Sequence, residues 1–479
     1  MLLITIRVSD IIIASYNYYF LETSTVSTKA TGFWGPAIFL LGISQSVIAD
    51  EAAMLKTLQE QIQQQQKQLE QQQQQIETLA DQLEKQPAEK TETGEKAGGL
   101  SWEGYGVVNY QRFDFFENAQ DTTPETRAST DLERIILAPH FDMGNGYHFV
   151  AEIEIEHGGT GSTVEFEPEE AGEFEAEIEK GGEVVLEQAQ LIIEHSPALN
   201  LRFGEFLVPF GMINTHHEPT EYFTLQRSLA EDSLLPSVWH EAGIGLFGEI
   251  GQLRYEGQII TALDSSGFSG FNFIKGGMQS KLEIDNADDL AFVGSVNYSP
   301  LLGVTLGGAF YTGDSSGNRP RKNLEQSANV TLFEVHGRYE KGPLAIRAEY
   351  LEGTIENSDA VTQANLTTFN GGILGVSKTP VGHKAEAWFI EAGYDIFSLF
   401  NKDLGKLFGF ARYEAFDTHA ETEGVIAKVA RYDREATTFG VNYHPRPGVV
   451  FKAEYSYREN ASSQANEQDV YGLGVGFEF

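Results

Sequence analysis

The residues of this chain whose types suit chemistry are charged side chains that recur at every second position of apolar segments. Three glutamates alternate with apolar residues in residues 147–156, and charged and polar side chains do the same in residues 449–458. A period of two places the two kinds of side chain on opposite faces of a β-strand. A charged face of this kind attracts and orients solutes in water. The pattern therefore predicts an electrostatic surface rather than a reaction centre.

The chain shows no sequence motif that by itself identifies a catalytic site. It contains no GxxxxGK[ST] and no HExxH, and its single GxSxG string, Gly313-Asp314-Ser315-Ser316-Gly317, has no His at a spacing that would identify a nucleophile and its base. The lack of cysteine removes thiol nucleophiles and thiolate metal sites. His216, His217 and Glu218, followed by Glu221, offer imidazole and carboxylate groups that suit a divalent metal. Adjacent residues on an extended segment point apart, so we predict no metal site, no cofactor and no enzymatic activity. A catalytic site assembled from distant residues, as in barrel hydrolases of the outer membrane, stays an alternative.

The composition narrows the class of protein. The chain has 479 residues, 49 Gly, a net charge of -37 and a mean hydropathy of -0.27, values unlike those of a helical membrane protein. A transmembrane barrel needs an apolar side chain only at every second position, so its sequence stays polar on average. The acidity argues against nucleic acid as a partner, because neutralising phosphates requires clustered Lys and Arg.

The amino-terminal region predicts export from the cytoplasm. Residues 36–49 form a short apolar run with Val47 and Ala49 at the small-residue positions of a cleavage site. The run is shorter than the roughly 20 apolar residues that span a bilayer, although a retained anchor is an alternative. We assign residues 1–49 to a leader and signal peptide and exclude them from the fold.

A heptad pattern follows the signal peptide. Within residues 50–86, apolar residues recur every seven positions, which predicts an α-helical coiled coil through which chains associate in the periplasm. A Gln-rich spacer that is only partly helical is the alternative. Residues 87–100 form a polar linker. The seam of the coiled coil consists of Leu55, Ile62, Leu69, Ile76 and Leu83.

The remaining residues, 101–479, alternate with a period of two. Tight turns such as Asn145-Gly146 and Gly342-Pro343 alternate with long connections along the chain, and the number of strands is even. This arrangement is typical of outer-membrane barrels, whose short turns lie in the periplasm and whose long loops lie outside the cell. We therefore predict an all-β fold, a 16-stranded antiparallel transmembrane β-barrel preceded by the coiled coil. The predicted strands are 101–116, 131–143, 147–157, 183–195, 199–210, 241–250, 252–263, 290–299, 302–313, 330–341, 343–352, 387–398, 406–417, 436–444, 449–458 and 469–479.

The carboxyl-terminal segment supports a membrane barrel. Alternate positions from Tyr471 to Phe479 are apolar, and the positions between them are three glycines and Glu478. One face of this strand therefore suits lipid and the other suits water. The terminal Phe resembles the end-signal by which outer-membrane barrels are recognised for insertion. An edge strand of a soluble sandwich is the alternative.

The charged strand faces are assigned to the inside of the barrel. A barrel of about sixteen strands is wide enough for an aqueous channel, and an Arg or Lys on the lipid face near mid-bilayer costs roughly 2–4 kcal/mol. The inward set contains more acids than bases, which raises the local concentration of cations. Mutually neutralising ion pairs in a solvated lumen are the alternative. The predicted pore-lining residues are Glu152, Glu154, Glu156, Arg202, Arg254, Arg338, Arg347, Arg412, Lys452 and Arg458.

The third long connection, residues 211–240, is predicted to fold into the lumen and to constrict it. Its apolar residues, from Tyr222 to Trp239, suit packing against the inner wall. A surface loop at a contact between chains is the competing interpretation. The residues predicted to line the constriction are Glu221, Arg227, Glu231 and Asp232.

A second connection is strongly acidic. Residues 165–180 contain eight Glu and one Lys. Such density is typical of a solvated loop held open by repulsion. Bridging by divalent cations, within the loop or to the phosphates of outer-leaflet lipid, is the alternative.

One stretch resembles a known family. Residues 186–211 resemble the signature of the phosphate-selective porin O and P family, in which a strand leads through a turn into an RxGxFxxPFG strand. The resemblance implies a sixteen-stranded trimeric porin, and the siderophore-type porins share a similar strand. It implies phosphate selectivity through inward Arg and Lys, whereas the inward set here is tilted to acid. The matching residues are Arg202, Gly204, Phe206, Pro209, Phe210 and Gly211.

The combined pattern predicts an outer-membrane porin through which small polar or charged solutes diffuse passively. The predicted partners are outer-membrane lipid, small solutes and two further copies in a homotrimer. Alternatives are an envelope tether anchored by a barrel, a siderophore-type uptake porin, and a sleeve for another protein such as a cytochrome.

Overall fold

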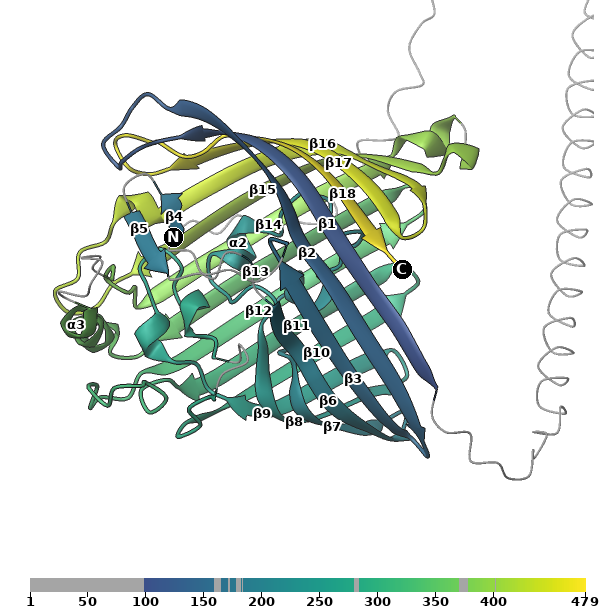
Figure 1. Cartoon of the computed structure of the whole chain (residues 1–479), viewed down its shortest axis with the longest axis horizontal. Helices are drawn as coiled ribbons and strands as arrows, with labels where there is room; N and C mark the ends of the chain where they lie inside the picture. The colour runs from purple at the N-terminus through teal and green to yellow at the C-terminus, as the bar shows by residue number, and fades with distance from the viewer. Residues whose placement is uncertain are drawn as a thin grey trace, which may run out of the picture. The chain divides into compact units, whose positions relative to one another are not determined.

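The computed structural model describes residues 99–158, 165–170, 173–177, 182, 184–279, 284–369, 378–400 and 402–479. These residues form one closed antiparallel barrel and a separate two-stranded sheet, β4–β5 (Figure 1). The predicted signal peptide, the coiled coil of residues 50–86 and most of the linker lie outside the described residues. Within the described residues, no helix is long and apolar enough to cross a bilayer.

The sixteen barrel strands confirm the predicted all-β fold. Consecutive barrel strands are neighbours throughout, with β6 following β3 around the wall. The strands are β1 (Leu100–Phe115), β2 (Glu125–Gly144), β3 (Tyr147–Glu156), β4 (Glu165–Glu170), β5 (Glu173–Glu177), β6 (Val184–Ser196), β7 (Leu199–Leu207), β8 (His240–Ile250), β9 (Leu253–Thr261), β10 (Leu290–Leu301), β11 (Val304–Asp314), β12 (Asn329–Lys341), β13 (Leu344–Ile355), β14 (Lys384–Asp395), β15 (Lys406–Glu421), β16 (Asp433–Arg446), β17 (Val449–Asn460) and β18 (Val470–Glu478). The helices are η2 (Asn214–His216), α2 (Leu229–Asp232), η3 (Ser265–Gly267), η4 (Lys275–Gly277), α3 (Ser358–Phe369), η5 (Ile396–Leu399), η6 (Lys402–Leu404) and η7 (Ala430–Tyr432).

The barrel closes between its first and last strands. β1 pairs with β18 over nine residues, and the backbones of Gly104 and Phe479 exchange hydrogen bonds of 3.0 and 2.9 Å. A Cβ on Gly104 would lie 2.8 Å from the Phe479 ring, and a Cβ on Gly106 would lie 2.5 Å from the Phe477 ring. The two glycines therefore make room for the terminal aromatic side chains, and closure leaves no free strand edge.

The turns sort by length as the sequence predicts. Tight turns join strands at one end of the barrel, where Asn145 and Gly146 adopt φ values of 56° and 80°. Asn and Gly tolerate this left-handed conformation, which matches the twist of a hairpin. The long connections lie at the opposite end, together with α3 and the β4–β5 sheet (Figure 1). Neither α3 nor β4–β5 was predicted from the sequence.

The two faces of the wall differ as predicted. Large apolar side chains are exposed on the outside, such as Phe149 on β3, Ile390 on β14 and Leu473 on β18. A continuous exposed apolar band of this kind is rare on proteins in water and suits contact with lipid. The side chains that alternate with them face the inside of the barrel, and many of them are buried, such as Glu391 on β14 and Lys452 on β17.

Candidate functional site: the lumen and its third loop

Loop L3, residues 208–239 between β7 and β8, lies inside the barrel. Carboxylates on the inner wall accept hydrogen bonds from its backbone, since Met212 N–H donates to Glu349 on β13 at 2.6 Å and Leu225 N–H donates to Glu454 on β17 at 2.6 Å. A third such bond joins Leu229 N–H to Glu414 on β15 at 2.8 Å. L3 is thus the third long loop and folds inward.

Donors on the wall hold the carbonyl groups of L3. Lys452 on β17 donates to the carbonyl oxygens of Tyr222 at 2.9 Å and Thr224 at 2.8 Å. Asn442 on β16 donates to the carbonyl oxygen of Phe223 at 2.8 Å. The backbone polar groups of the loop, which an apolar wall would leave unpaired, therefore find partners on the barrel.

Phe223 anchors the middle of L3 by its side chain. Its ring stacks on Phe410 at a centroid distance of 5.4 Å and an angle of 11°, and Phe408 lies at the same distance. The Arg347 guanidinium lies 4.8 Å from the ring centroid. A Cβ on Gly393 would lie 2.3 Å from this ring, so β14 needs a glycine beneath it. Aromatic and cation–π contacts of this kind are favourable in a partly dry site.

The glycines of the last strand face L3. A Cβ on Gly474 would lie 2.1 Å from the Leu225 side chain, and a Cβ on Gly476 would lie 2.6 Å from Pro219. On the other side of the seam, the ring of Tyr105 lies 6.0 Å from that of His217. From the sequence we expect the inward face of this strand, with its glycines, to face water. In the structure these glycines instead provide space for the packed loop L3.

A buried carboxylate organises the interior of L3. Glu231 accepts hydrogen bonds from the N–H groups of Ile213 at 2.8 Å and Asn214 at 2.6 Å, and Ser228 caps the short helix α2. Burial raises the pKa of Glu231 above its usual range, although these backbone donors and contact with Glu349 oppose the rise. Gly211, at a φ of 88°, leaves no room for a side chain beside this carboxylate.

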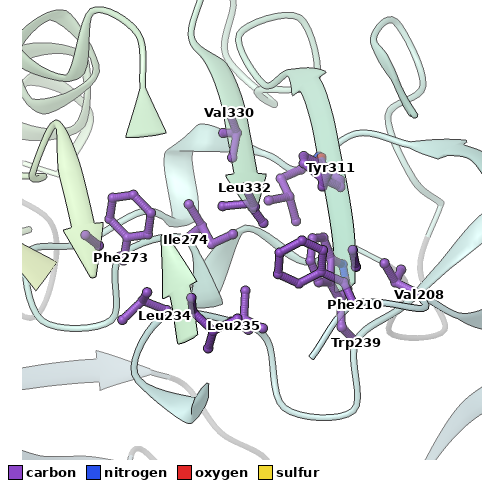
Figure 2. Close-up of a cluster of buried hydrophobic side chains, with 14 of the residues drawn as sticks. Val208, Phe210, Leu234, Leu235, Trp239, Phe273, Ile274, Tyr311, Val330 and Leu332 are labelled. Atoms are coloured by element: carbon purple, nitrogen blue, oxygen red, sulfur yellow. The ribbon is translucent and has the colours of Figure 1, made fainter. Parts of the chain in front are cut away.

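An apolar cluster fills the lumen behind L3 (Figure 2). Trp239 of L3 is fully buried, and its ring lies 5.0 Å from that of Tyr311 on β11. Phe273 and Ile274 belong to loop L4 (residues 262–289, described except for 280–283), which joins the same cluster. Apolar side chains buried in this way behave as a protein core, so one side of the barrel interior is packed rather than open.

The predicted pore-lining residues point inward, and most of the basic ones are paired with acids. Arg347 and Arg412 share Glu391, and they are almost fully buried beside L3. Lys452 is buried under the carbonyl groups of L3. Arg254 stays exposed at the tight-turn end, 3.7 Å from Glu249. For five inward arginines the nearest carboxylates are Glu154 at 2.9 Å from Arg134, Glu256 at 3.2 Å from Arg202, Glu221 at 3.0 Å from Arg338, Glu340 at 2.7 Å from Arg347 and Glu391 at 2.6 Å from Arg412.

The wall of β2 and β3 holds the predicted glutamates. Glu154 and Glu156 lie 2.9 and 3.3 Å from Arg134 on β2, another residue that the alternation of the sequence assigns to the inward face. Glu152 accepts a hydrogen bond from Gln188 and lies 3.8 Å from His217 of L3. Arg458 on β17 donates to Ser456 at 3.3 Å.

The residues predicted to line the constriction lie in different surroundings. Glu221 is 43% exposed and pairs with Arg338. Among the described residues, the terminal nitrogens of Arg227 have no hydrogen-bond partner. Asp232 pairs with Lys275 of L4 at 3.1 Å, and Lys275 and Ser237 lower its pKa although burial acts to raise it. Glu231 is buried inside the loop. Its carboxylate accepts hydrogen bonds from backbone N–H groups of L3 and does not face the lumen.

The histidine pair of L3 is engaged by the loop itself. His216 contacts the Met212 carbonyl oxygen at 3.1 Å, and burial lowers its pKa to about 4. His217 contacts the Asn214 carbonyl oxygen at 2.8 Å. Across the described part of the chain, no three His, Asp or Glu side chains gather in a way that suits a metal ion.

Comparison with known proteins identifies the family. The family model of Gram-negative porins matches residues 86–479, which include the whole barrel. The chain belongs to the Gram-negative porin family. The porin is therefore a channel of the bacterial outer membrane for passive diffusion of small solutes, and it is not an enzyme, as predicted.

The porin is also similar to individual proteins. An uncharacterized protein of Aquifex aeolicus is 26% identical over 384 residues, which are 80% of each chain. Among solved structures, OmpF of Salmonella typhi in complex with daunomycin has 11% identity and a TM-score of 0.49, over 81% of this chain and 99% of that one. The outer membrane channel DcaP of Acinetobacter baumannii has 10% identity and a TM-score of 0.48, with the same coverage. An anion-selective porin from Comamonas acidovorans has 11% identity and a TM-score of 0.47, over 80% of this chain and all of that one.

Proposed function

We propose that L3 forms the narrowest part of the passage and that the porin favours small cations and neutral polar solutes over anions. The observation that supports this proposal is the unequal exposure of paired inward charges. Glu221 and Glu340 are 43% and 39% exposed, whereas their partner Arg338 is 13% exposed. Acids therefore reach the water of the lumen more than bases do.

The electrostatic consequence follows from the surroundings of the pore. A channel with low-dielectric walls concentrates ions of the sign opposite to its exposed charge. Arg134 and Arg202 are 11% and 16% exposed and are bonded to glutamates, so their positive charge is largely neutralised. Arg254 is 75% exposed, and it lies at the tight-turn end, away from L3.

The motif shared with the phosphate-selective porins supports an architectural role. Pro209, Phe210 and Gly211 begin L3, where Phe210 is buried in the apolar cluster and Gly211 adopts a positive φ. Arg202 of the same motif pairs with Glu256. We infer that the motif directs L3 into the lumen and that it does not provide a phosphate site.

The assembly follows from the resemblance and from the heptads. We propose a homotrimer of barrels, with the coiled coil of residues 50–86 in the periplasm. Chemical crosslinking of the mature protein in outer membranes, with and without residues 50–99, tests this assembly. A crosslinked trimer is expected, and a product that stays monomeric in both cases contradicts it.

Reversal potentials in planar bilayers test the ion preference. With a tenfold KCl gradient, we expect the sign of the reversal potential to indicate K⁺ preference, and Glu221→Gln to reduce it. Glu435→Gln is the matched control, because Glu435 lies on the outer face of β16 and bonds Tyr413 there. A Cl⁻ preference of the native channel contradicts the proposal. Equal reversal potentials for Glu221→Gln and Glu435→Gln contradict it as well.

A further inference from the structure

A groove of about 670 Å³ lies on the outside of the barrel at the seam. It is formed by β1, β2, β17 and β18, and its volume is within the range of small-molecule sites. Outward side chains of β1 and β18 line it. They include Tyr110, Arg112 and Asp114 on β1, and Tyr471 and Leu473 on β18.

Arg112 is an outward-facing cation in this groove. It shares the outer face of β1 with Val108 and Tyr110, which are 39% and 43% exposed. In the register of the seam, Arg112 lies opposite Tyr471. Throughout the described chain, Arg112 has no hydrogen-bond or ion-pair partner, in contrast to most of the inward arginines. Its guanidinium is therefore available to a ligand.

The groove lies near the long-loop end of the wall. Arg112 is three residues from the end of β1 at Phe115, where the long connections begin. Tyr455 and Tyr471 lie beside it, with ring centroids 4.5 Å apart. Tyrosines are enriched at membrane–water boundaries because one end of the side chain is apolar and the other is polar. Near the membrane surface an outward Arg costs much less than at mid-bilayer.

We propose that this groove binds the phosphate-bearing headgroup of an outer-leaflet lipid, with the Arg112 guanidinium on the phosphate and the acyl chains along Tyr110 and Leu473. Guanidinium is suited to phosphate because its N–H groups form two parallel charge-assisted hydrogen bonds. The apolar wall below Arg112 continues to the terminal Phe479, which gives the acyl chains a continuous surface. A lipid thus satisfies both the cation and the apolar part of the groove.

Three acids line the groove, Asp114, Glu454 and Asp469, and the Glu454 carboxylate is turned inward to the Leu225 N–H of L3. Asp469 accepts hydrogen bonds from the Tyr455 hydroxyl at 2.7 Å and from the Arg458 N–H at 3.1 Å, so both of its oxygens have donors. Asp114 lies close enough to Asp469 for the two carboxylates to repel each other. Because these donors are neutral, Asp469 keeps its negative charge, and a phosphate on Arg112 experiences repulsion from both Asp114 and Asp469. Removal of the Asp114 charge is expected to tighten binding.

Native mass spectrometry of the delipidated mature protein tests the proposal. The probes are phosphatidic acid, diacylglycerol with the same acyl chains, and inorganic phosphate. We expect phosphatidic acid to bind the native protein more tightly than diacylglycerol does. Arg112→Gln should weaken its binding about tenfold, the loss of a charge-assisted hydrogen bond, and Asp114→Asn should strengthen it. Arg446→Gln, at the exposed β16–β17 turn, is the matched control and should bind as the native protein does.

Three results would overturn the proposal. The first is equal binding of phosphatidic acid to the native protein and Arg112→Gln, or equal binding of diacylglycerol and phosphatidic acid. The second is displacement of phosphatidic acid by inorganic phosphate at the same concentration, which assigns the groove to free phosphate. The third is a change in the number of chains per assembly in Arg112→Gln with lipid binding unchanged, which assigns the groove to a contact between copies. Single-channel conductance should be the same in native and variant proteins, so this test does not depend on the proposed ion preference.

Discussion

At the scale of single residues, the inward charges of this porin serve two different purposes. Glu349, Glu414 and Glu454 accept hydrogen bonds from the backbone of L3, whereas Glu221 and Glu340 stay exposed to the lumen. Strand periodicity predicts that the four of them on strands point inward, whereas Glu221 lies on L3. Periodicity does not separate the two groups, because the separation depends on where a distant loop lies. Leu225 and Glu454, for example, are 229 residues apart in the chain.

Glu231→Gln tests the organising role of the buried carboxylate in L3. The carboxamide keeps the size of the side chain but presents an NH₂ group to one of the two backbone donors, from Ile213 and Asn214. An unsatisfied buried donor costs about 1–3 kcal/mol. We expect faster hydrogen exchange at these two amides and noisier single-channel currents. Glu221→Gln should leave both exchange rates unchanged, and slow exchange in both variants would contradict the role.

The ion pair between Asp232 of L3 and Lys275 of L4 predicts a dependence on pH. The pKa of Asp232 in the folded protein is below its usual value of about 3.9. The stabilisation is therefore present above that value and is lost as the pH falls through the folded-state pKa. Because both side chains are partly exposed, the contribution is small, about 1 kcal/mol or less. The noise of the single-channel current should rise below about pH 4 in the native protein. Asp232→Asn should show this higher noise at neutral pH as well. Identical noise in the native protein and in Asp232→Asn at all pH values would exclude this contribution.

At the scale of elements, L3 and L4 turn part of a hollow barrel into a packed interior. The apolar residues of L3 predict that it folds inward, and the structure agrees. The strands themselves were predictable, because alternation over ten or more residues is a strong signal. The parts of the strands that continue past the predicted segments were not predictable. β2 begins at Glu125 rather than at residue 131, since its polar first residues pair with β1.

The helix α3 and the sheet β4–β5 escaped prediction for a related reason. Both occur in long polar connections, where no apolar periodicity distinguishes a helix or a strand from a loop. The positions of the glycines in β18 were visible in the sequence. Their purpose was not, because it depends on Leu225 and Pro219 of a loop more than 230 residues earlier.

Phe223→Ala tests how firmly L3 is anchored. The ring packs between Phe408, Phe410 and Arg347, and its loss leaves a cavity where Gly393 provides no side chain to fill it. Truncation of a buried Phe typically costs about 3–5 kcal/mol. We expect L3 to loosen and the single-channel conductance to rise or to split into several levels. Phe439→Ala, on the exposed outer face of β16, is the control and should leave the conductance unchanged; equal conductance in all three proteins would contradict the anchoring role.

At the scale of the whole molecule, the closed sheet determines both the membrane-facing surface and the enclosed lumen. The even number of strands and the alternation of short and long connections were sufficient to predict it. The width of the passage was not predictable in this way, because the side chains and loops that fill the lumen come from segments far apart in the chain.

Gly104→Ala tests the closure of the barrel. A Cβ at this position would lie 2.4 Å from the Ile136 carbonyl oxygen and 2.8 Å from the Phe479 ring. Overpacking of this kind costs about 1–3 kcal/mol. We expect the unfolding temperature in detergent to fall and the folded band in unheated gel electrophoresis to weaken. Gly257→Ala is the matched control, since the nearest atom to its Cβ lies 4.0 Å away; equal stability of the two variants would mean that the seam tolerates the extra methyl group.

The contacts of L3 on both sides of the seam have a consequence for biogenesis. Pro219 and Leu225 lie against β18, while His217 lies against Tyr105 of β1. The loop therefore touches the first strand to emerge during synthesis and the last. We therefore expect closure of the barrel at its two terminal strands to depend on entry of L3 into the lumen, because the glycines of β18 leave space that Pro219 and Leu225 fill.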